Sequence, residues 1–279
     1  MRSLSTTTTD LTDFVSLDTR PSFRNQVRLG VWRGVRAYKK DYPEREYWET
    51  EVSMLSLLKD HPYIITPAIY GANEDSLSVV MSEIPGQRLE HVDSELVTSL
   101  AVTLRVLHQE QGARALVRMD MLKRLQLFHG NIAKAACLTA DESKQAMQAL
   151  RILDRELRPV IDESNDVVHG DFNLGNVLFN KVSRKLGLID FERSFVGLGL
   201  VDLAKGAWRI LNHNTEAVDL LLHAYYGRVP TSDERRLFCL VSVLEYLGAI
   251  SYFALEGHAN GYPYKDEAFK HLKQCLSQF

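Results

Sequence analysis

The most constraining feature of this chain is a pair of short apolar runs that each end in polar residues. Val167-Val168 is followed at once by His169-Gly170-Asp171, and Asn176 comes five positions after the aspartate. A second run, Leu186 to Ile189, ends in Asp190. Short apolar runs of this kind are typical of buried strands, and a buried strand that ends in an aspartate directs the carboxylate into a cleft. Phosphoryl transfer needs one carboxylate beside the acceptor hydroxyl and hard oxygen ligands for magnesium. The pattern therefore predicts such a site.

The details of this pattern point to one group of kinases. The spacing from Asp171 to Asn176 is that of the protein-kinase catalytic loop, and Asp190-Phe191-Glu192 stands where kinases keep Asp-Phe-Gly. Protein kinases place Arg before the catalytic Asp, whereas His-Gly-Asp at 169–171 followed by Ile-Asp-Phe at 189–191 resembles the aminoglycoside phosphotransferase and choline kinase family. Met81-Ser82-Glu83 is similar to the hinge of aminoglycoside 3'-phosphotransferases. The resemblance runs from about residue 20 to the end and is most specific over 167–204.

The resemblance implies an α+β, protein-kinase-like two-lobe fold with a small β-rich N-lobe and a larger, mainly helical C-lobe. The local patterns agree with it. β-branched and aromatic residues flank a tight Arg33-Gly34 turn, which predicts a hairpin, and Asp41 is expected to cap the next helix. Helical periodicity dominates after Ile84-Pro85-Gly86. We predict a flexible segment at 1–12, an N-lobe at 13–84 and a C-lobe at 85–279.

Three residues are expected to carry the chemistry. Asp171 is predicted to orient the acceptor hydroxyl and to accept its proton as the catalytic base. Asn176 and Asp190 are predicted to hold Mg²⁺ through a neutral and a charged oxygen. Each residue taken alone has a plain structural alternative, as a turn or strand-end cap, but the three together form a composite motif with a mechanism.

Lys39 is the candidate contact to the phosphates of the nucleotide. Ala37 precedes it by two residues, as in the Val-Ala-Ile-Lys strand of kinases. Strand alternation would then point Lys39 into the cleft and Lys40 the other way. Glu51 stands on the following helix, where the family keeps the glutamate that pairs with this lysine. The alternative is that Lys39 and Glu51 are two solvated charges.

The nucleotide is expected to be ATP, and the sequence does not distinguish ATP from GTP. No Gly-x-Gly-x-x-Gly occurs near the first hairpin, so the resemblance assigns the phosphate-covering loop to Ser22 through Asn25, acting through backbone N–H groups. It also implies adenine contacts from the Ser82 carbonyl and the Ile84 amide.

Two further residues are expected to support the site. In the resembling family the position of His169 holds the catalytic loop and carries no proton. Asp202 is expected to accept hydrogen bonds from the catalytic-loop backbone, and the alternative is an N-cap of the helix that follows it.

Bulk properties exclude some other classes of protein. A net charge of −3 and a pI near 6.3 give no reason to expect a nucleic-acid or membrane partner. The chain shows no apolar signal core at its start, and its three cysteines have no metal or redox spacing, which favours the cytoplasm. Glu245 interrupts the long apolar stretch at 237–255, and Thr231 with Glu234 forms a capping box upstream, so this stretch is interpreted as a buried helix.

The sequence thus predicts an ATP- and Mg²⁺-dependent kinase that phosphorylates a hydroxyl of a small molecule, such as an aminoglycoside or other antibiotic, an amino alcohol or a sugar. Glu192, Glu245, Tyr252 and Glu256 are candidates for contacts with such a substrate. Glu245, Tyr252 and Glu256 lie at helical spacing and could equally be a solvated or internally paired stripe. A catalytically silent pseudokinase or nucleotide-binding regulatory module is the main alternative, favoured by the glycine-poor loop. A protein kinase is a weaker one, because no Ala-Pro-Glu follows Asp190. The oligomeric state and the acceptor stay open.

Overall fold

A computed structural model describes residues 9–21, 26–111, 116–256 and 262–277 of the chain. The chain divides into two compact units. The first consists of Met1–Val117 with His169–Phe195, and the second of Arg118–Val168 with Val196–Phe279. The segment that carries the Asp171 motif therefore belongs to the same unit as the N-terminal sheet. The lobe boundary expected after residue 84 stays a prediction.

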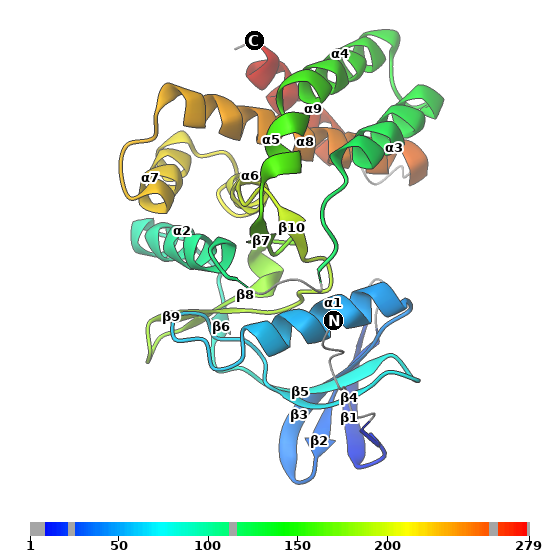
Figure 1. Ribbon diagram of the computed structural model, residues 1–279, viewed down its shortest axis with the longest axis vertical. Coiled ribbons are helices and arrows are strands. Elements are labelled where there is room, and N and C mark those ends of the chain that lie inside the picture. Colours follow the sequence, from blue (N-terminus) through cyan, green and yellow to red (C-terminus); the bar gives the residue numbers. More distant parts are fainter. Residues whose placement is uncertain (1–8, 22–25, 112–115, 257–261, 278–279) are drawn as a thin grey trace. The chain divides into compact units, whose positions relative to one another are not determined.

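The first unit is built on a five-stranded antiparallel sheet in the order β1-β2-β3-β5-β4 (Figure 1). The predicted hairpin is confirmed. Its turn residues Arg33 and Gly34 have φ angles of 47° and 83°, the left-handed conformation that a two-residue hairpin loop requires. The strands are β1 (Phe14–Pro21), β2 (Gln26–Trp32), β3 (Val35–Asp41), β4 (Ile69–Asn73) and β5 (Ser78–Ser82).

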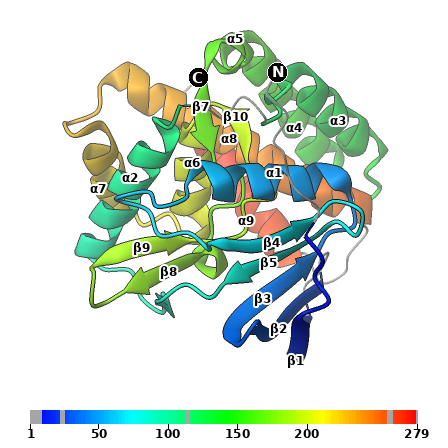
Figure 2. The ribbon, with the colours of Figure 1, turned by 60° about the horizontal axis from the view of Figure 1, so that its bottom comes forward.

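Helix α1 (Arg45–Leu57) lies against strands β4 and β5 (Figure 2). Its buried residues include Val52, Met54 and Leu55, which supply the apolar face expected from the sequence. Asp41 does not cap this helix, contrary to prediction. It is the last residue of β3, because ladder pairing with Ser78 carries the strand that far, and the helix begins without a side-chain cap.

A second, three-stranded sheet in the same unit carries the Asp190 strand. Its order is β6-β8-β9, and the single-turn helix η1 leads directly into β8. Helix α2 packs on β9, and its first turn is capped by Asp93, whose carboxylate accepts the Leu96 N–H at 2.9 Å. These elements are β6 (Gln87–Arg88), α2 (Ser94–His108), η1 (Leu174–Asn176), β8 (Val177–Asn180) and β9 (Lys185–Leu188).

The second unit is mainly helical, and helix α8 contacts α3, α4, α6 and α9 within it (Figure 1). The predicted capping box is confirmed, because the Glu234 N–H donates to Thr231 Oγ1 at 3.2 Å and the Thr231 N–H donates back to Glu234 at 2.8 Å. The elements are α3 (Met121–Lys134), α4 (Ala140–Glu156), α5 (Arg158–Glu163), β7 (Asp166–Val168), β10 (Phe195–Gly197), α6 (Leu200–Arg209), α7 (Thr215–Tyr226), α8 (Ser232–Glu256) and α9 (Tyr262–Leu276).

Glu245, which interrupts the apolar run of α8, is buried in this unit. It forms ion pairs with Arg124 at 3.2 Å and with Lys205 at 3.7 Å. These pairs favour the internally paired role that the sequence left open for Glu245. Among the described residues, no helix is both long and apolar enough to span a membrane.

Candidate active site

The first unit contains a pocket of about 330 Å³ whose lining includes five of the predicted site residues. Strands β2, β3 and β5 form one side of it, and the segment from η1 to the end of β9 forms another. Its lining includes Lys40, Glu51, Ser82, Ile84, Asn176 and Asp190.

The turn that delivers Asp171 depends on a glycine. Gly170 has a φ of +80°, and a Cβ atom at this position would lie 2.0 Å from the Arg193 carbonyl oxygen. A residue with a side chain adopts this φ only at an energetic cost, and its Cβ atom would overlap the Arg193 carbonyl oxygen. Only glycine therefore fits at this position. The close approach brings the His-Gly-Asp turn onto the segment that follows Asp190.

His169 fastens this turn from inside the unit. Its Nδ1 accepts the Asp171 N–H at 3.3 Å, so the ring proton is on Nε2, which donates to the Ile189 carbonyl at 3.1 Å. The ring is fully buried and lies 4.7 Å from the Phe191 ring, centroid to centroid. A histidine held in this way links the turn at Asp171 to the residue that follows β9. Its role in supporting a catalytic loop stays a prediction.

Asn176 is bonded directly to Asp171. Its Nδ2 donates to the Asp171 carbonyl at 2.9 Å and to the carboxylate Oδ2 at 3.1 Å. The preceding turn is closed by Asn173, whose side chain accepts the Gly175 N–H at 2.8 Å. Since the Asn176 amide nitrogen makes these bonds, its Oδ1 is the atom that can act as a metal ligand. The same contact fixes the Asp171 Oδ2.

Asp190 lies just beyond the end of β9 in a left-handed backbone conformation, with a φ of 67°. A non-glycine residue held there costs about 1–3 kcal/mol, and such strain is concentrated at functional sites. The Ile189 N–H donates to the Asn176 carbonyl at 3.1 Å, so the segments that carry Asn176 and Asp190 are hydrogen-bonded to each other. Both residues line the pocket. Two oxygen donors are therefore presented together, and they suit magnesium, which takes hard oxygen ligands.

The lysine at this site is Lys40, so the predicted pairing of Lys39 with Glu51 is wrong. Lys40 Nζ lies 2.6 Å from Glu51 and 2.9 Å from Glu192, and it also contacts the Asp190 carboxylate. Lys39 instead lies 3.6 Å from Asp41.

The reason for this correction is the side of β3 that faces the core. Ala37 is fully buried and packs with Leu11, Trp32 and Val80. Because side chains alternate along a strand, Lys39 shares the face of Ala37, while Lys40 shares the pocket-lining face of Tyr38. The side chains of β3 alternate as predicted, but the pocket lies on the face opposite to the predicted one.

Burial and charge act in opposite directions on Lys40. Burial alone would lower the pKa of its ammonium group, but the carboxylates of Glu51, Asp190 and Glu192 outweigh it and raise the pKa above the ordinary value. Burial also raises the pKa of Tyr42, whose hydroxyl donates to Glu51 at 2.7 Å. Three carboxylates thus surround one ammonium group, and the local negative charge favours a bound cation.

Glu192 is a functional candidate whose position the sequence did not predict. It was considered for substrate contact, yet it is buried and paired with Lys40. Its place two residues after Asp190 was the available signal, because a glutamate replaces the glycine of Asp-Phe-Gly there. Tyr42 gave no comparable signal.

The predicted hinge residues Ser82 and Ile84 line the pocket. Ser82 is fixed through both its N–H, which donates to the Ala68 carbonyl at 2.8 Å, and its Oγ, which accepts the Ala68 N–H at 2.9 Å. Asp202 is fully buried in the first turn of α6, whose N-cap is Gly199, so the N-cap alternative is wrong. Its supporting role stays a prediction. Ser22 and Asn25 lie outside the described residues.

Comparison with solved structures gives the fold. The GDP complex of aminoglycoside 2'-phosphotransferase-IIIa has a TM-score of 0.70 at 16% identity, with 96% of this chain and 94% of that chain covered. Choline kinase LicA from Streptococcus pneumoniae matches with a TM-score of 0.70 at 18% identity over 95% of each chain. A choline/ethanolamine kinase family protein from Mesorhizobium loti has a TM-score of 0.70 at 16% identity, with 98% and 90% covered.

Comparison with sequences gives the family. No curated protein matches the chain. The model of the phosphotransferase enzyme family matches residues 22–238, which include the Asp171 loop, Asn176 and Asp190. The α+β, protein-kinase-like fold predicted from the sequence is confirmed. This chain belongs to the phosphotransferase enzyme family.

Proposed function

We propose that this protein transfers the terminal phosphoryl group of ATP or GTP to a hydroxyl group of a small molecule, with Mg²⁺ as cofactor. Asp171 is the catalytic base, and Asn176 and Asp190 are the metal ligands. Lys40, braced by Glu51, takes the role of phosphate contact that the sequence gave to Lys39.

One observation carries this proposal. The Asn176 side chain bonds to Asp171 at 3.1 Å and also lines the pocket that contains Asp190 and Lys40. A single residue thus joins the expected base to the expected metal ligand and phosphate contact. Family membership supports the same reading, because the three motif residues fall inside the matched segment.

The residues at this site can supply positioning and charge, which is most of what phosphoryl transfer requires. Asp171 would orient the acceptor hydroxyl and accept its proton, a contribution of about 10²–10⁴-fold. Lys40 would hold phosphate oxygens through its ammonium group, which stays fully protonated at neutral pH. Bound Mg²⁺ would neutralise phosphate charge between the Asn176 Oδ1 and the Asp190 carboxylate.

The similar proteins support the proposal of a nucleotide donor and a small-molecule acceptor. Solved relatives are complexes with GDP, with AMP, and with GDP and kanamycin. The Ser82 carbonyl and the Ile84 amide are proposed to contact the nucleotide base, since both residues line the pocket. Aminoglycosides, other antibiotics, amino alcohols and sugars are the acceptor classes to test.

Turnover is the direct test. Purified protein is incubated with ATP or GTP, Mg²⁺ and a panel of hydroxylated compounds, and nucleoside diphosphate release above the rate without acceptor is measured. Phosphorylated product is then identified by mass spectrometry. We expect at least one acceptor to be phosphorylated, and Asp171→Asn to lower kcat by about 10²–10⁴-fold while nucleotide affinity changes little.

The pseudokinase alternative makes a different prediction. It requires that the wild-type protein binds nucleotide, seen as a shift in Tm, while no acceptor in the panel is phosphorylated and Asp171→Asn behaves as wild type. Equal activity of wild type and Asp171→Asn on any acceptor would refute the role given to Asp171.

A further inference from the structure

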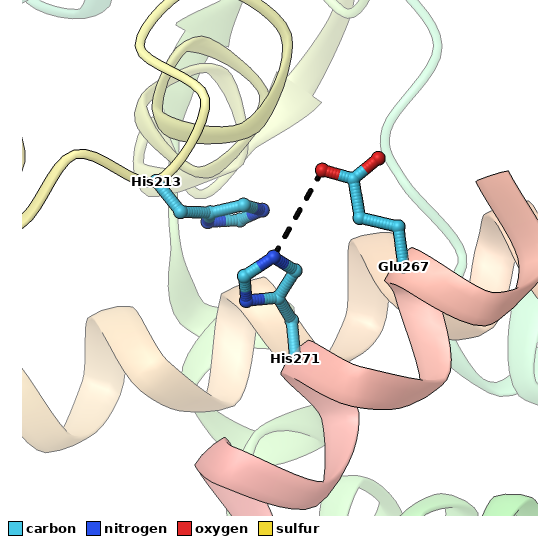
Figure 3. Close-up of side chains that lie close together, drawn as sticks. All are labelled: His213, Glu267 and His271. Atoms are coloured by element: carbon cyan, nitrogen blue, oxygen red, sulfur yellow. Dashed lines mark ion pairs between the residues drawn. The ribbon is translucent and has the colours of Figure 1, made fainter. Parts of the chain in front are cut away.

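The second unit holds another cluster of metal-ligating side chains, which the phosphotransferase site does not use. His213 lies in the loop between α6 and α7, while Glu267 and His271 lie one turn apart on α9 (Figure 3). One ligand atom of each residue lies within 4.8 Å of the other two. Figure 3 shows the three side chains close together, with the His213 ring over the His271 ring at 3.6 Å between centroids and an ion pair between His271 and Glu267.

His213 is prepared to act as a ligand. Its Nδ1 is bonded to the Tyr246 hydroxyl at 3.3 Å, whereas its Nε2 is buried and has no hydrogen-bond partner within the described part of the chain. Buried polar atoms are rarely left unpaired, so this nitrogen is a candidate to bind an ion or a water molecule. Burial, with the nearby charges of His271 and Lys270, lowers the pKa of His213 to about 4, which keeps the ring neutral at pH 7.

His271 also has an outer partner on Nδ1, while its Nε2 faces Glu267. Its Nδ1 lies 3.0 Å from the Gln274 side-chain oxygen, which can only accept, so Nδ1 carries the proton. Its Nε2 lies 3.9 Å from the Glu267 carboxylate, beyond hydrogen-bond distance. In a tetrahedral site with bonds of about 2.0–2.1 Å, neighbouring ligand atoms are about 3.3 Å apart. The two rings lie over each other with 3.6 Å between centroids, so binding of an ion requires side-chain rotations that turn both ring nitrogens toward it.

We propose that His213, Glu267 and His271 bind a divalent transition-metal ion, with Zn²⁺ as the best fit. Two imidazoles and one carboxylate form a ligand set that zinc uses, with a fourth position for water. Imidazole nitrogens argue against Mg²⁺ and Ca²⁺, which take oxygen ligands. Gln274 is the outer partner that fixes the tautomer of His271, and the Tyr246 hydroxyl can accept from His213 Nδ1 in the tautomer that leaves Nε2 as a ligand, as is usual for metal-bound histidines.

The ion would link the α6–α7 loop to α9 within the second unit. His213 holds a left-handed backbone conformation with a φ of 54°, and its N–H donates to the Ala207 carbonyl at 2.9 Å. The backbone of His213 is therefore held in place before an ion binds. The competing explanation is an ion pair between protonated His271 and Glu267, which needs no contribution from His213.

Metal binding to the full-length, chelator-treated protein tests the proposal. Zn²⁺ stoichiometry and affinity are measured by calorimetry, and Co²⁺ is used as a spectroscopic probe of the coordination. The ligand variants are His213→Asn, which tolerates the left-handed conformation, Glu267→Gln and His271→Gln. Tyr246→Phe tests the outer partner. His223→Gln, an exposed histidine of α7, is the matched control.

Two further variants separate this site from other metal-binding groups. Asp190→Asn removes a carboxylate of the phosphotransferase pocket, and the double variant Cys239→Ser/Cys275→Ser removes neighbouring thiols of the second unit. Zn²⁺ binding should persist in both, and the Co²⁺ spectrum should lack a thiolate charge-transfer band.

We expect one Zn²⁺ per chain, a loss of affinity of at least tenfold for each ligand variant, and about 10–100-fold for Tyr246→Phe. His223→Gln should bind as wild type does. The wild-type Tm should rise with Zn²⁺, and that of His213→Asn should not. The proposal is overturned if wild type binds no Zn²⁺ at micromolar concentration, or if His213→Asn and Glu267→Gln, both folded by circular dichroism, bind Zn²⁺ as tightly as wild type. Loss of binding only in the cysteine double variant would also overturn it.

Discussion

Replacing Lys40 with methionine is the sharpest test of the active-site geometry. The Lys40 side chain is 7% exposed and its ammonium group contacts Glu51, Asp190 and Glu192. Methionine keeps most of the length and apolar character of the stem but removes the charge. The substitution therefore separates what the charge does from what the packing of the side chain does.

The structure allows the size of the effect to be worked out. Glu51 and Glu192 are 1% and 7% exposed, so Lys40→Met leaves two buried carboxylates without their cation. Breaking a buried ion pair in this way costs about 3–5 kcal/mol, which for a chain of this size corresponds to a fall in Tm of about 10 °C. Removing a group that stabilises transition-state charge typically lowers turnover about 10²–10³-fold, and we expect this loss in kcat/KM.

Lys39→Met is the matched control on the neighbouring residue. Lys39 is partly exposed and lies 3.6 Å from Asp41, a spacing typical of weak surface ion pairs. Such a pair contributes about 0–1 kcal/mol. We expect Lys39→Met to keep kcat/KM within about threefold of wild type and to lower the free energy of unfolding by less than about 1 kcal/mol.

Loss of stability and loss of activity must be distinguished in this experiment. The double variant Lys40→Met/Glu51→Gln removes one uncompensated buried carboxylate, so the free energy of unfolding should recover by about 1–3 kcal/mol over the single variant. Its kcat/KM should stay low, because the phosphate contact is still missing. Urea unfolding followed by circular dichroism gives the free energies, and diphosphate release on the best acceptor gives kcat/KM.

One outcome would contradict the assignment of Lys40 as the phosphate contact. If Lys39→Met loses as much kcat/KM as Lys40→Met, or more, then Lys40 is not the phosphate contact and the face assigned to β3 is wrong. Recovery of kcat/KM in the double variant would show instead that the single variant lost activity through folding.

Two further predictions concern the backbone of the catalytic loop and a helix cap. Gly170→Ala should lower the free energy of unfolding by more than about 1–3 kcal/mol, because its Cβ would meet the Arg193 carbonyl oxygen at 2.0 Å. Gly130 lies in an open position of α3, so the control Gly130→Ala should raise the free energy of unfolding by about 0.5–1 kcal/mol in the same urea experiment. Hydrogen bonds from Arg228 lower the pKa of Glu234 to about 2 from 4.5, so its contribution to stability is present above about pH 4.5 and is lost as the pH falls toward 2. Glu234→Gln should therefore be less stable than wild type at pH 7, and urea unfolding should show the difference narrowing below about pH 4.5; a constant difference would contradict the assignment.

The sequence by itself determined the features that depend on neighbours along the chain. The Arg33-Gly34 turn, the capping box at Thr231 and the five-residue spacing that lets Asn176 bond to Asp171 are local features, and each can be recognised in the sequence. Such features follow from backbone conformations and hydrogen bonds within a few residues, which leave a readable pattern. The same is true of the family, because its motif is compact.

The features that depend on which face of a strand or helix is buried came only from the tertiary structure. Both Lys39 and Lys40 fit the strand pattern, and only the packing of Ala37 against Trp32 and Val80 showed which lysine faces the pocket. The meeting of His213 with α9 likewise joins residues far apart in sequence. Alternation along a strand fixes only that neighbouring side chains point apart, whereas the choice of side is made by contacts between segments that no local pattern contains.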